Sequence, residues 1–299
     1  MRSRNDMKPE QISHTAAFIA IKFYGLTRTE PFRGWFEEDV IRFYEKIVHE
    51  LPRPLNGYYH SLKKSWVRKF FIVSEGLLLP GDLMHIILRK YLVGRWVDEC
   101  LNDDFEQLLV LGAGFDHQAA RQAARGIPSL EIDMPKMAAF KRNFLLQQYA
   151  GQPHPAIRQH DFSREHGGLI QSLRETLDNR RNTVVIAEGF FDYLRNEQTE
   201  DILRELGFWF KGRTTLISTH FALDELPIIR RAVFKTGVAL VGEKIMSDLD
   251  KPGYLKLLRR VGFTKQDIMS PGDMEQELLY PAGVNYPAMK GFYLISAEA

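Results

Sequence analysis

Two closely spaced glycines follow a short apolar run near the middle of the chain. Residues 108–111 are apolar without alternation, which is typical of a strand covered on both faces in a parallel sheet. Gly112 and Gly114 then allow a sharp turn against which a ligand can lie. A second strand-like run over residues 129–133 ends in Asp133, 21 residues after Gly112 (133 − 112). At this spacing a carboxylate binds the two hydroxyls of an adenosine ribose.

Two classes of ligand fit this pattern. A dinucleotide site has a small third residue in G-x-G-x-x-G/A, where it packs closely around a pyrophosphate. The sequence has the large His117 at that position. S-adenosylmethionine has no pyrophosphate and needs only the glycines and the acid, so the pattern favours it. An NAD-dependent dehydrogenase and a non-catalytic protein that binds an adenosine ligand remain alternatives.

Composition and charge narrow the class of protein. The chain has 299 residues, 44% of them hydrophobic, and a net charge of +2, which predicts no general affinity for nucleic acid or membranes. A single cysteine, Cys100, excludes an internal disulfide and a multi-cysteine metal site, and no metal is expected. Cys100 lies in a helical pattern and is expected to be buried. Without a signal peptide or an apolar run of membrane length, a cytoplasmic enzyme is expected.

The pattern of elements changes near residue 105. Before it, helices are predicted over residues 16–24, 35–51, 62–79 and 84–101, the first of them capped by Ser13 or Thr15. After it, helices alternate with strands, which implies a parallel α/β sheet. We expect strands over residues 108–111, 129–133, 156–161, 183–187, 214–219 and 291–296. Residues 1–105 would form a helical lid and 106–299 a catalytic domain, with an acceptor-covering insertion around 221–285.

Polar residues follow several of the predicted strands. In open α/β sheets the ligand lies beyond the carboxyl ends of the strands. Asp161 would accept a hydrogen bond from the adenine amino group, and the Phe162 N–H would donate to a ring nitrogen. Glu188 would face the ammonium group of the cofactor. The alternatives are that Asp161 only caps a helix and that Glu188 is a surface carboxylate.

Three ordered motifs resemble the leucine carboxyl methyltransferase family. They are Leu111-Gly-Ala-Gly-Phe-Asp116 with Arg121, Glu131-Ile-Asp133 with Pro135, and Ala187-Glu-Gly-Phe-Phe-Asp-Tyr-Leu194. The resemblance implies a Rossmann-like class I fold that uses S-adenosylmethionine. It also implies that the cofactor contacts Gly112, Asp133, Asp161, Phe162 and Glu188, and the glycine turn adds Gly114 to these expected contacts. By the same resemblance Lys22 and Arg89 would bind the cofactor carboxylate, with Arg95 as a rival to Arg89.

The sequence departs from the family pattern at Leu130 and His117, and residues 220–285 carry no clear family signature. Acceptor specificity would be expected in that last segment. The resemblance therefore supports the cofactor and the type of reaction more than the acceptor. Asp116 and Arg121 are expected to brace the glycine turn as an ion pair.

Methyl transfer is an in-line displacement, for which the protein supplies alignment and desolvation. A carboxylate acceptor needs no base, whereas a hydroxyl acceptor usually does. His220, after the fifth strand, is the first candidate for that base, and Tyr193 and Asp192 are candidates for positioning the acceptor. We expect an O-methyltransferase acting on a small-molecule carboxylate or hydroxyl under the aromatic lid. The family's name makes a protein C-terminal carboxylate the alternative acceptor. The acceptor's identity and the oligomeric state stay open.

Overall fold

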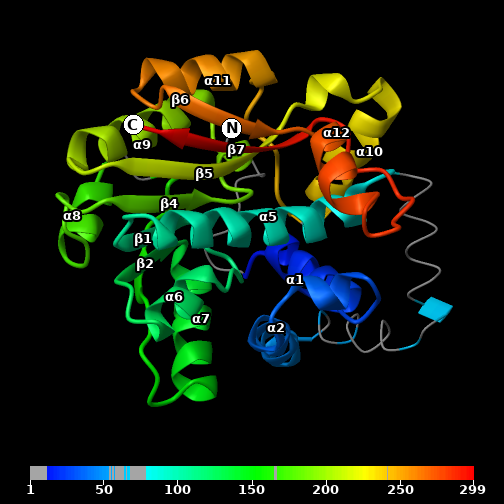
Figure 1. Cartoon of the computed structure of the whole chain (residues 1–299), viewed down its shortest axis with the longest axis horizontal. Helices are drawn as coiled ribbons and strands as arrows, with labels where there is room; N and C mark the ends of the chain where they lie inside the picture. Colours follow the sequence, from blue (N-terminus) through cyan, green and yellow to red (C-terminus); the bar gives the residue numbers. More distant parts are fainter. Residues whose placement is uncertain are drawn as a thin grey trace, which may run out of the picture.

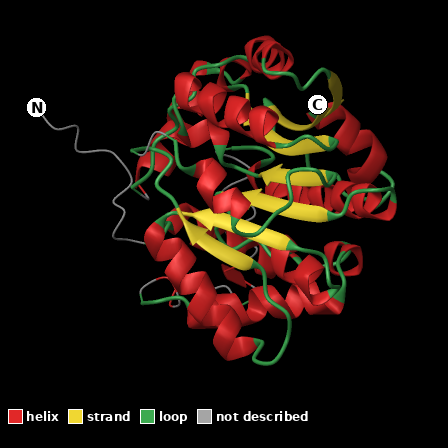
Figure 2. Ribbon diagram, turned by 90° about the vertical axis from the view of Figure 1, so that its left-hand side faces the viewer, coloured by secondary structure: helices red, strands yellow, loops and turns green. Residues whose placement is uncertain are grey.

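The computed structural model describes residues 12–53, 55, 57, 64, 66–67, 79–164, 167–240 and 242–299. Its centre is a seven-stranded sheet in the order β3-β2-β1-β4-β5-β7-β6. Helices lie on both sides of the sheet (Figure 2). The strands are β1 (Gln107–Leu111), β2 (Ser129–Asp133), β3 (Ala156–Gln159), β4 (Thr183–Ala187), β5 (Thr214–Phe221), β6 (Lys265–Met269) and β7 (Phe292–Glu298).

The first five strands are parallel, and β7 is antiparallel to both of its neighbours, β5 and β6. Every residue of β1 and β4 is buried, which explains their unbroken apolar sequences. Within the sheet, the chain runs from β1 outward to β2 and β3 and then crosses back to β4, which lies on the other side of β1. The order of the strands therefore reverses between β1 and β4, and a crevice forms there at their carboxyl ends.

Helices cover both faces of this sheet (Figure 1). Helix α5 contacts β4, β5 and β7, while α6 contacts β1 and β2, α7 contacts β2 and β3, and α11 contacts β5. The α-helices are α1 (His14–Leu26), α2 (Glu38–Glu50), α5 (Asp82–Asn102), α6 (Gln118–Ala124), α7 (Pro135–Gln148), α8 (Leu169–Arg174), α9 (Asn196–Trp209), α10 (Ile228–Leu240), α11 (Lys251–Arg260) and α12 (Pro271–Met274). Short turns add η1 (Phe32–Trp35), η2 (Phe191–Tyr193), η3 (Leu223–Glu225) and η4 (Glu275–Leu279).

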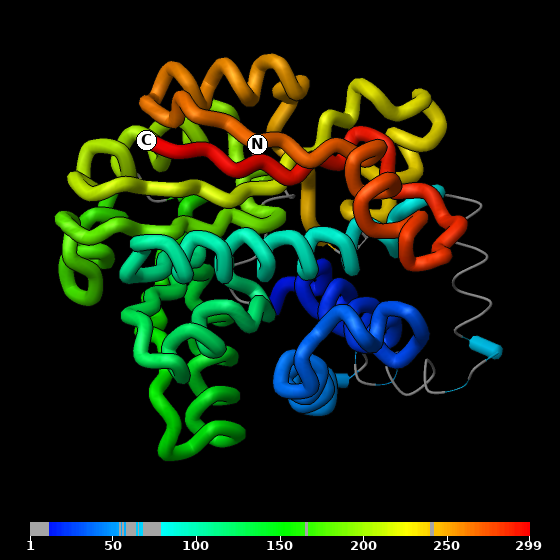
Figure 3. The backbone as a smooth tube through the Cα atoms, viewed as in Figure 1, coloured from blue at the N-terminus to red at the C-terminus, as the bar shows by residue number. Residues whose placement is uncertain are grey.

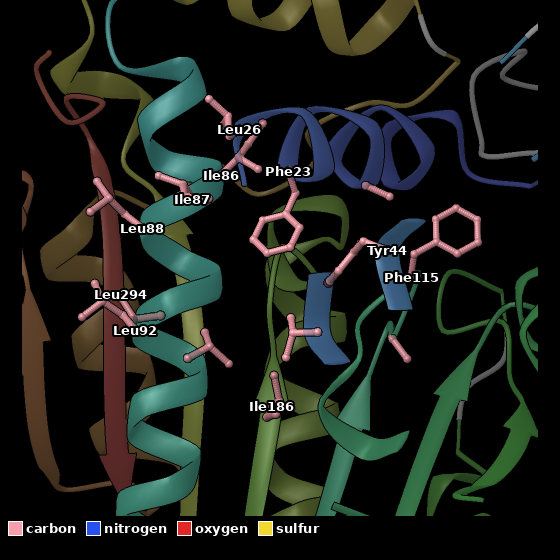
Figure 4. Packing of buried hydrophobic residues seen from close by; sticks show 14 of the residues in the cluster. Phe23, Leu26, Tyr44, Ile86, Ile87, Leu88, Leu92, Phe115, Ile186 and Leu294 are labelled. Atoms are coloured by element: carbon pink, nitrogen blue, oxygen red, sulfur yellow. The ribbon is translucent and has the colours of Figure 1, made fainter. Parts of the chain in front are cut away.

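Helix α1 packs against α5, and α2 packs against α1 and α7, so both N-terminal helices join the body of the sheet (Figure 3). Phe23 and Leu26 of α1 face Ile86 and Ile87 of α5, as Figure 4 shows. Farther along α5, Leu88 and Leu92 lie toward Leu294 of β7 (Figure 4). All these side chains belong to one buried cluster that also contains residues of β1 and β4. Helix α5 therefore lies between α1 and the sheet and packs against both.

Most of the predicted elements are present. The strands predicted over 129–133 and 183–187 match β2 and β4, and Ser13 caps α1 by accepting a hydrogen bond from the Ala16 N–H. Strand β6 was not predicted, and the helix predicted over 62–79 falls almost wholly outside the described residues. Cys100 is half-buried rather than buried. None of the described helices combines the length and apolar character needed to cross a membrane. The division into 1–105 and 106–299 stays a prediction.

Candidate functional site

A cavity of about 220 Å³ lies at the carboxyl ends of β1 and β4, where the strand order reverses. Residues that follow each of the first four strands line it, together with Phe221 at the end of β5. Eight of the predicted site residues are in its wall: Arg89, Gly112, Gly114, Asp133, Asp161, Phe162, Glu188 and Tyr193. Lys22, Asp192 and His220 are not among the described residues that line it.

The glycine turn after β1 forms one wall of the cavity. Gly112 and Gly114 have φ angles of +58° and +49°, which side chains with a Cβ rarely adopt. A Cβ on Gly112 would come 2.4 Å from Cδ2 of Phe190. The turn is therefore possible only with glycine at this position, and it leaves the backbone itself facing the cavity.

Asp133 ends β2 directly beside this turn. Its Oδ2 accepts a hydrogen bond from the Gly114 N–H (2.6 Å), and its Oδ1 accepts one from the Met134 N–H (2.6 Å). Burial raises the pKa of this carboxyl, and the two backbone donors work against that rise. The two N–H groups also fix the orientation of the carboxylate against the glycine turn. Asp133 is therefore placed to accept hydrogen bonds from a diol.

The next strand end supplies Asp161 and Phe162. Asp161 Oδ1 accepts hydrogen bonds from the N–H (3.1 Å) and hydroxyl (2.5 Å) of Ser163, which holds the loop after β3 in a local turn. The Phe162 ring packs edge-on against Phe190, with centroids 5.0 Å apart. Gln198 of α9 donates to the Phe162 carbonyl at 3.2 Å and also lines the cavity. Two aromatic rings therefore lie beside polar groups in this part of the wall, an arrangement that suits a purine ring.

The cavity wall also contains a buried cluster of four charged side chains. Arg89 Nε is 2.9 Å from Glu188 Oε1, and Lys90 Nζ is 2.8 Å from Asp116 Oδ2 and 3.0 Å from Glu188 Oε1. Each of these side chains is 5–6% exposed. Burial opposes the charge of Lys90, but Asp116 and Glu188 outweigh it and raise its pKa. Lys90 therefore keeps its charge, and the two cations and two carboxylates of this cluster all line the cavity.

The predicted ion pair between Asp116 and Arg121 is wrong. Asp116 pairs with Lys90, whereas Arg121 binds Asp98 (2.8 Å) on α5 and Glu37 (2.8 Å) before α2. Asp116 lies two residues before α6 and lines the cavity, whereas Arg121 lies within α6 and points to Asp98 and Glu37. The two residues of this motif therefore have separate roles. Asp116 contributes to the cavity wall, and Arg121 links α6 to α5 and to the segment before α2.

Lys22 lies on α1 with its Nζ 3.0 Å from Asp82 Oδ2, at the start of α5. Its predicted role as a cofactor ligand stays a prediction, and its placement outside the cavity wall does not favour it. Arg95, the rival to Arg89, is 34% exposed and pairs with Glu99 and Glu277. Of the two arginines, only Arg89 lines the cavity.

His220 and Asp192 form a buried pair behind the cavity wall. Their Nδ1 and Oδ1 atoms are 3.7 Å apart, and the His220 ring stacks on Tyr254 with centroids 4.6 Å apart. Burial lowers the pKa of His220 to about 4 and raises that of Asp192 to about 7. Asp192 Oδ1 accepts the Phe221 N–H at 3.0 Å. The contacts of Asp192 and His220 hold the end of β5 in place. Because His220 lies outside the described cavity wall, this placement does not favour a general base at His220.

The remaining wall comes from outside the sheet. Helix α1 and the residue before it contribute Ser13, Thr15, Ala16, Ile19 and Ala20, and the segment after α10 contributes Glu243, Lys244 and Met246. Ser13 donates a hydrogen bond to Glu243 Oε1 at 2.5 Å and so joins two segments 230 residues apart in sequence. These segments cover the cavity opposite the strand ends.

The comparisons with known proteins agree with this geometry. Residues 68–207 match the family model of leucine carboxyl methyltransferase. The resemblance to this family is confirmed over that range. No curated protein matches the chain at the sequence level.

Solved structures share the fold predicted for this methyltransferase family. A DUF574 family protein from Streptomyces avermitilis is 14% identical with a TM-score of 0.53, over 75% of this chain and 87% of that one. Magnesium protoporphyrin IX methyltransferase from Synechocystis, solved with bound SAH, is 11% identical with a TM-score of 0.45, over 89% and 95%. An O-methyltransferase family protein from Burkholderia thailandensis is 11% identical with a TM-score of 0.45, over 72% and 58%. The chain spans 55–59% of the length of several such proteins.

The cofactor of this methyltransferase family is S-adenosylmethionine, and the residues of the cavity match its chemistry. The glycine turn leaves space that a Cβ would fill, Asp133 presents a carboxylate for the ribose, and the charged cluster complements an amino acid. The sequence did not indicate Lys90 or Glu243. Lys90 interrupts the apolar run of α5, which is the one sequence signal that could have found it.

Proposed function

We propose that this protein transfers the methyl group of S-adenosylmethionine to an oxygen atom of a small-molecule acceptor. Family and fold support S-adenosylmethionine-dependent methyltransferase activity. The observation that favours a small acceptor is that helix α1 and the segment after α10 both line the cavity, in addition to the strand ends. The hydrogen bond between Ser13 and Glu243 joins these two parts of the wall. A protein chain would need an open groove instead.

The chain's own residues orient the reactants. When bound, S-adenosylmethionine supplies a methyl group already activated by the positive sulfur. Asp133 would hold the ribose, and Arg89 and Lys90 would hold the carboxylate of the amino-acid part beside Glu188. Because these groups are fixed by buried contacts before the ligand arrives, little reorganisation is needed for in-line alignment. Tyr193, which lines the cavity near Glu243, would contact the acceptor.

The second candidate acceptor is a protein C-terminal carboxylate, which the name of the matching family suggests. One assay separates the two. The protein is incubated with methyl-labelled S-adenosylmethionine and either short peptides with free C-terminal carboxylates or a set of small phenols and carboxylic acids. We expect label in the small molecules and none in the peptides. Label in the peptides alone would contradict a small-molecule acceptor.

A further inference from the structure

Among the described residues five carboxylates line the cavity, and four of them lie at the carboxyl ends of the parallel strands. Glu188 pairs with Arg89 and Lys90, and Asp116 pairs with Lys90. Asp133 accepts two backbone N–H groups. The fourth, Asp161, accepts both donors of Ser163. All four belong to the ends of β1 to β4, where the cofactor would lie.

Glu243 is the fifth, and it comes from the covering segment rather than from the sheet. It is 5% exposed and accepts a hydrogen bond from the Ser13 hydroxyl. Among the described residues no lysine, arginine or histidine lies within ion-pair distance of it. Burial raises its pKa, whereas Ser13, Thr15 and the more distant His14 lower it. Lys244, its neighbour in sequence, is exposed at the mouth of the cavity.

Glu243 lines the same cavity as Asp133 and Tyr193, and the hydrogen bond from Ser13 holds it beside helix α1 rather than at a strand end. Tyr193 is a poor proton acceptor, because burial keeps its hydroxyl protonated. His220 is outside the wall. Glu243 is therefore the described cavity residue best placed to take a proton on the acceptor side.

We propose that Glu243 is the general base of the reaction and that the acceptor is a hydroxyl, such as a phenol, rather than a carboxylate. The acceptor oxygen forms a bond to the methyl carbon while the bond from that carbon to sulfur breaks, and the electron pair of that bond stays on sulfur. The proton of the hydroxyl passes to the Glu243 carboxylate. A carboxylate acceptor would instead bring a third negative charge close to the buried carboxylates of Glu243 and Asp133.

This inference rests on the proposed function, and one experiment separates their failures. The full chain is incubated with methyl-labelled S-adenosylmethionine and substituted phenols, each paired with the benzoic acid that carries the same substituents. Methyl ethers resist mild alkali, whereas methyl esters release methanol. We expect alkali-stable label in the phenols. Alkali-labile label in the benzoic acids would overturn the inference and leave the proposed function standing. No transfer to either set, with binding of S-adenosylhomocysteine intact, would contradict both.

The variant Glu243→Gln tests the role of the residue itself. We expect kcat to fall roughly 10²- to 10⁴-fold. The acid limb of the kcat/KM profile, set in the wild type by the ionisation of Glu243, should disappear. The affinity for S-adenosylhomocysteine, measured by calorimetric titration, should change less than about threefold, because glutamine keeps the acceptor for Ser13.

The matched control is Ser13→Ala, which removes the hydrogen bond but keeps the carboxylate. If Ser13→Ala lowers kcat as much as Glu243→Gln, or if the acid limb persists in Glu243→Gln, Glu243 is not the base.

Discussion

Asp192 is a carboxyl group buried without a cation to balance it. Its side chain is 2% exposed, and its Oδ2 has no hydrogen-bond partner in the described structure. The groups that face it are the His220 ring, the Phe221 N–H and, at longer range, Arg89. Burial raises its pKa to about 7. We infer that Asp192 is protonated in the folded protein at pH values where an unfolded aspartate has already ionised.

The stability of the protein should therefore depend on pH at Asp192. The pKa is about 7 in the folded state, against an ordinary value of 3.8 for an aspartate, so the folded state binds more protons between these values. The contribution of Asp192 is full below pH 4 and is lost as the pH rises through 7. Asp192→Asn keeps the acceptor for Phe221 and removes the ionisation. We expect the variant to gain roughly 2–4 kcal/mol relative to wild type between pH 4 and pH 8.

Urea unfolding at a series of pH values measures this difference. The exposed Asp201→Asn serves as the control, because it makes the same chemical change where no buried charge forms. An Asp192→Asn curve parallel to wild type across the range would show that the carboxyl ionises normally.

Some residues of the candidate site could be predicted from the sequence, and others could not. Asp133, Asp161 and Glu188 could be predicted because each lies at the end of a strand or within two residues of it. His220 was chosen by the same logic, but β5 extends to Phe221. Alternation along a strand then turns Phe221 to the cavity and His220 to the opposite face, against Tyr254. Glu243 could not be predicted, since its place depends on how the segment after α10 packs on α1.

At the scale of single elements, the turn after β1 depends on glycine. Gly112→Ala would combine a φ of +58° with a contact of 2.4 Å to Phe190. Gly126→Ala is the control, because its φ is +84° but no other atom lies within 4 Å of the added Cβ. We expect the control to lose about 1 kcal/mol of unfolding free energy and Gly112→Ala about 2–3 kcal/mol, with weaker cofactor binding. Equal losses in denaturant unfolding would mean that Phe190 moves aside freely.

Helix α7 is tied to β2 by a buried ion pair. Lys141 Nζ lies 2.8 Å from Glu131 Oε1, both side chains are at most 2% exposed, and Nζ also donates to the Asp116 carbonyl. Lys141→Met would leave Glu131 buried without its cation. We expect a loss of about 3–5 kcal/mol at neutral pH, measured by chemical denaturation.

Adding Glu131→Gln to Lys141→Met tests the cause of that loss. The double variant removes the unpaired charge, so it should recover a large part of the stability. If the double variant is as unstable as Lys141→Met alone, the loss of unfolding free energy comes from packing rather than from an unpaired charge.

The elements themselves could mostly be predicted from apolar runs. Strands β1, β2 and β4 are buried, and their sequences show it. Strand β6 has the polar sequence Lys265-Gln-Asp-Ile-Met269 because it is the exposed edge of the sheet, so its pattern gave no signal. The antiparallel insertion of β7 between β5 and β6 depends on long-range pairing and could not be predicted from local sequence.

At the scale of the whole molecule, the N-terminal helices and the sheet share one core. Side chains of α1, α2 and α5 form a single buried cluster with residues of β1, β4 and β7. The covering segments of the cavity are therefore held by the same packing that holds the strand ends. Ligand binding at the strand ends should stabilise the whole chain, because its binding energy adds to the folded state.

The most direct test of the site is the titration of the purified chain with S-adenosylhomocysteine and, separately, with NAD. We expect S-adenosylhomocysteine to bind, to raise the melting temperature, and to lose at least about 100-fold in affinity in Asp133→Ala, because a buried diol would be left without its acceptor. Binding of NAD instead, or an affinity for S-adenosylhomocysteine that Asp133→Ala leaves unchanged, would contradict an adenosyl site at the ends of these strands.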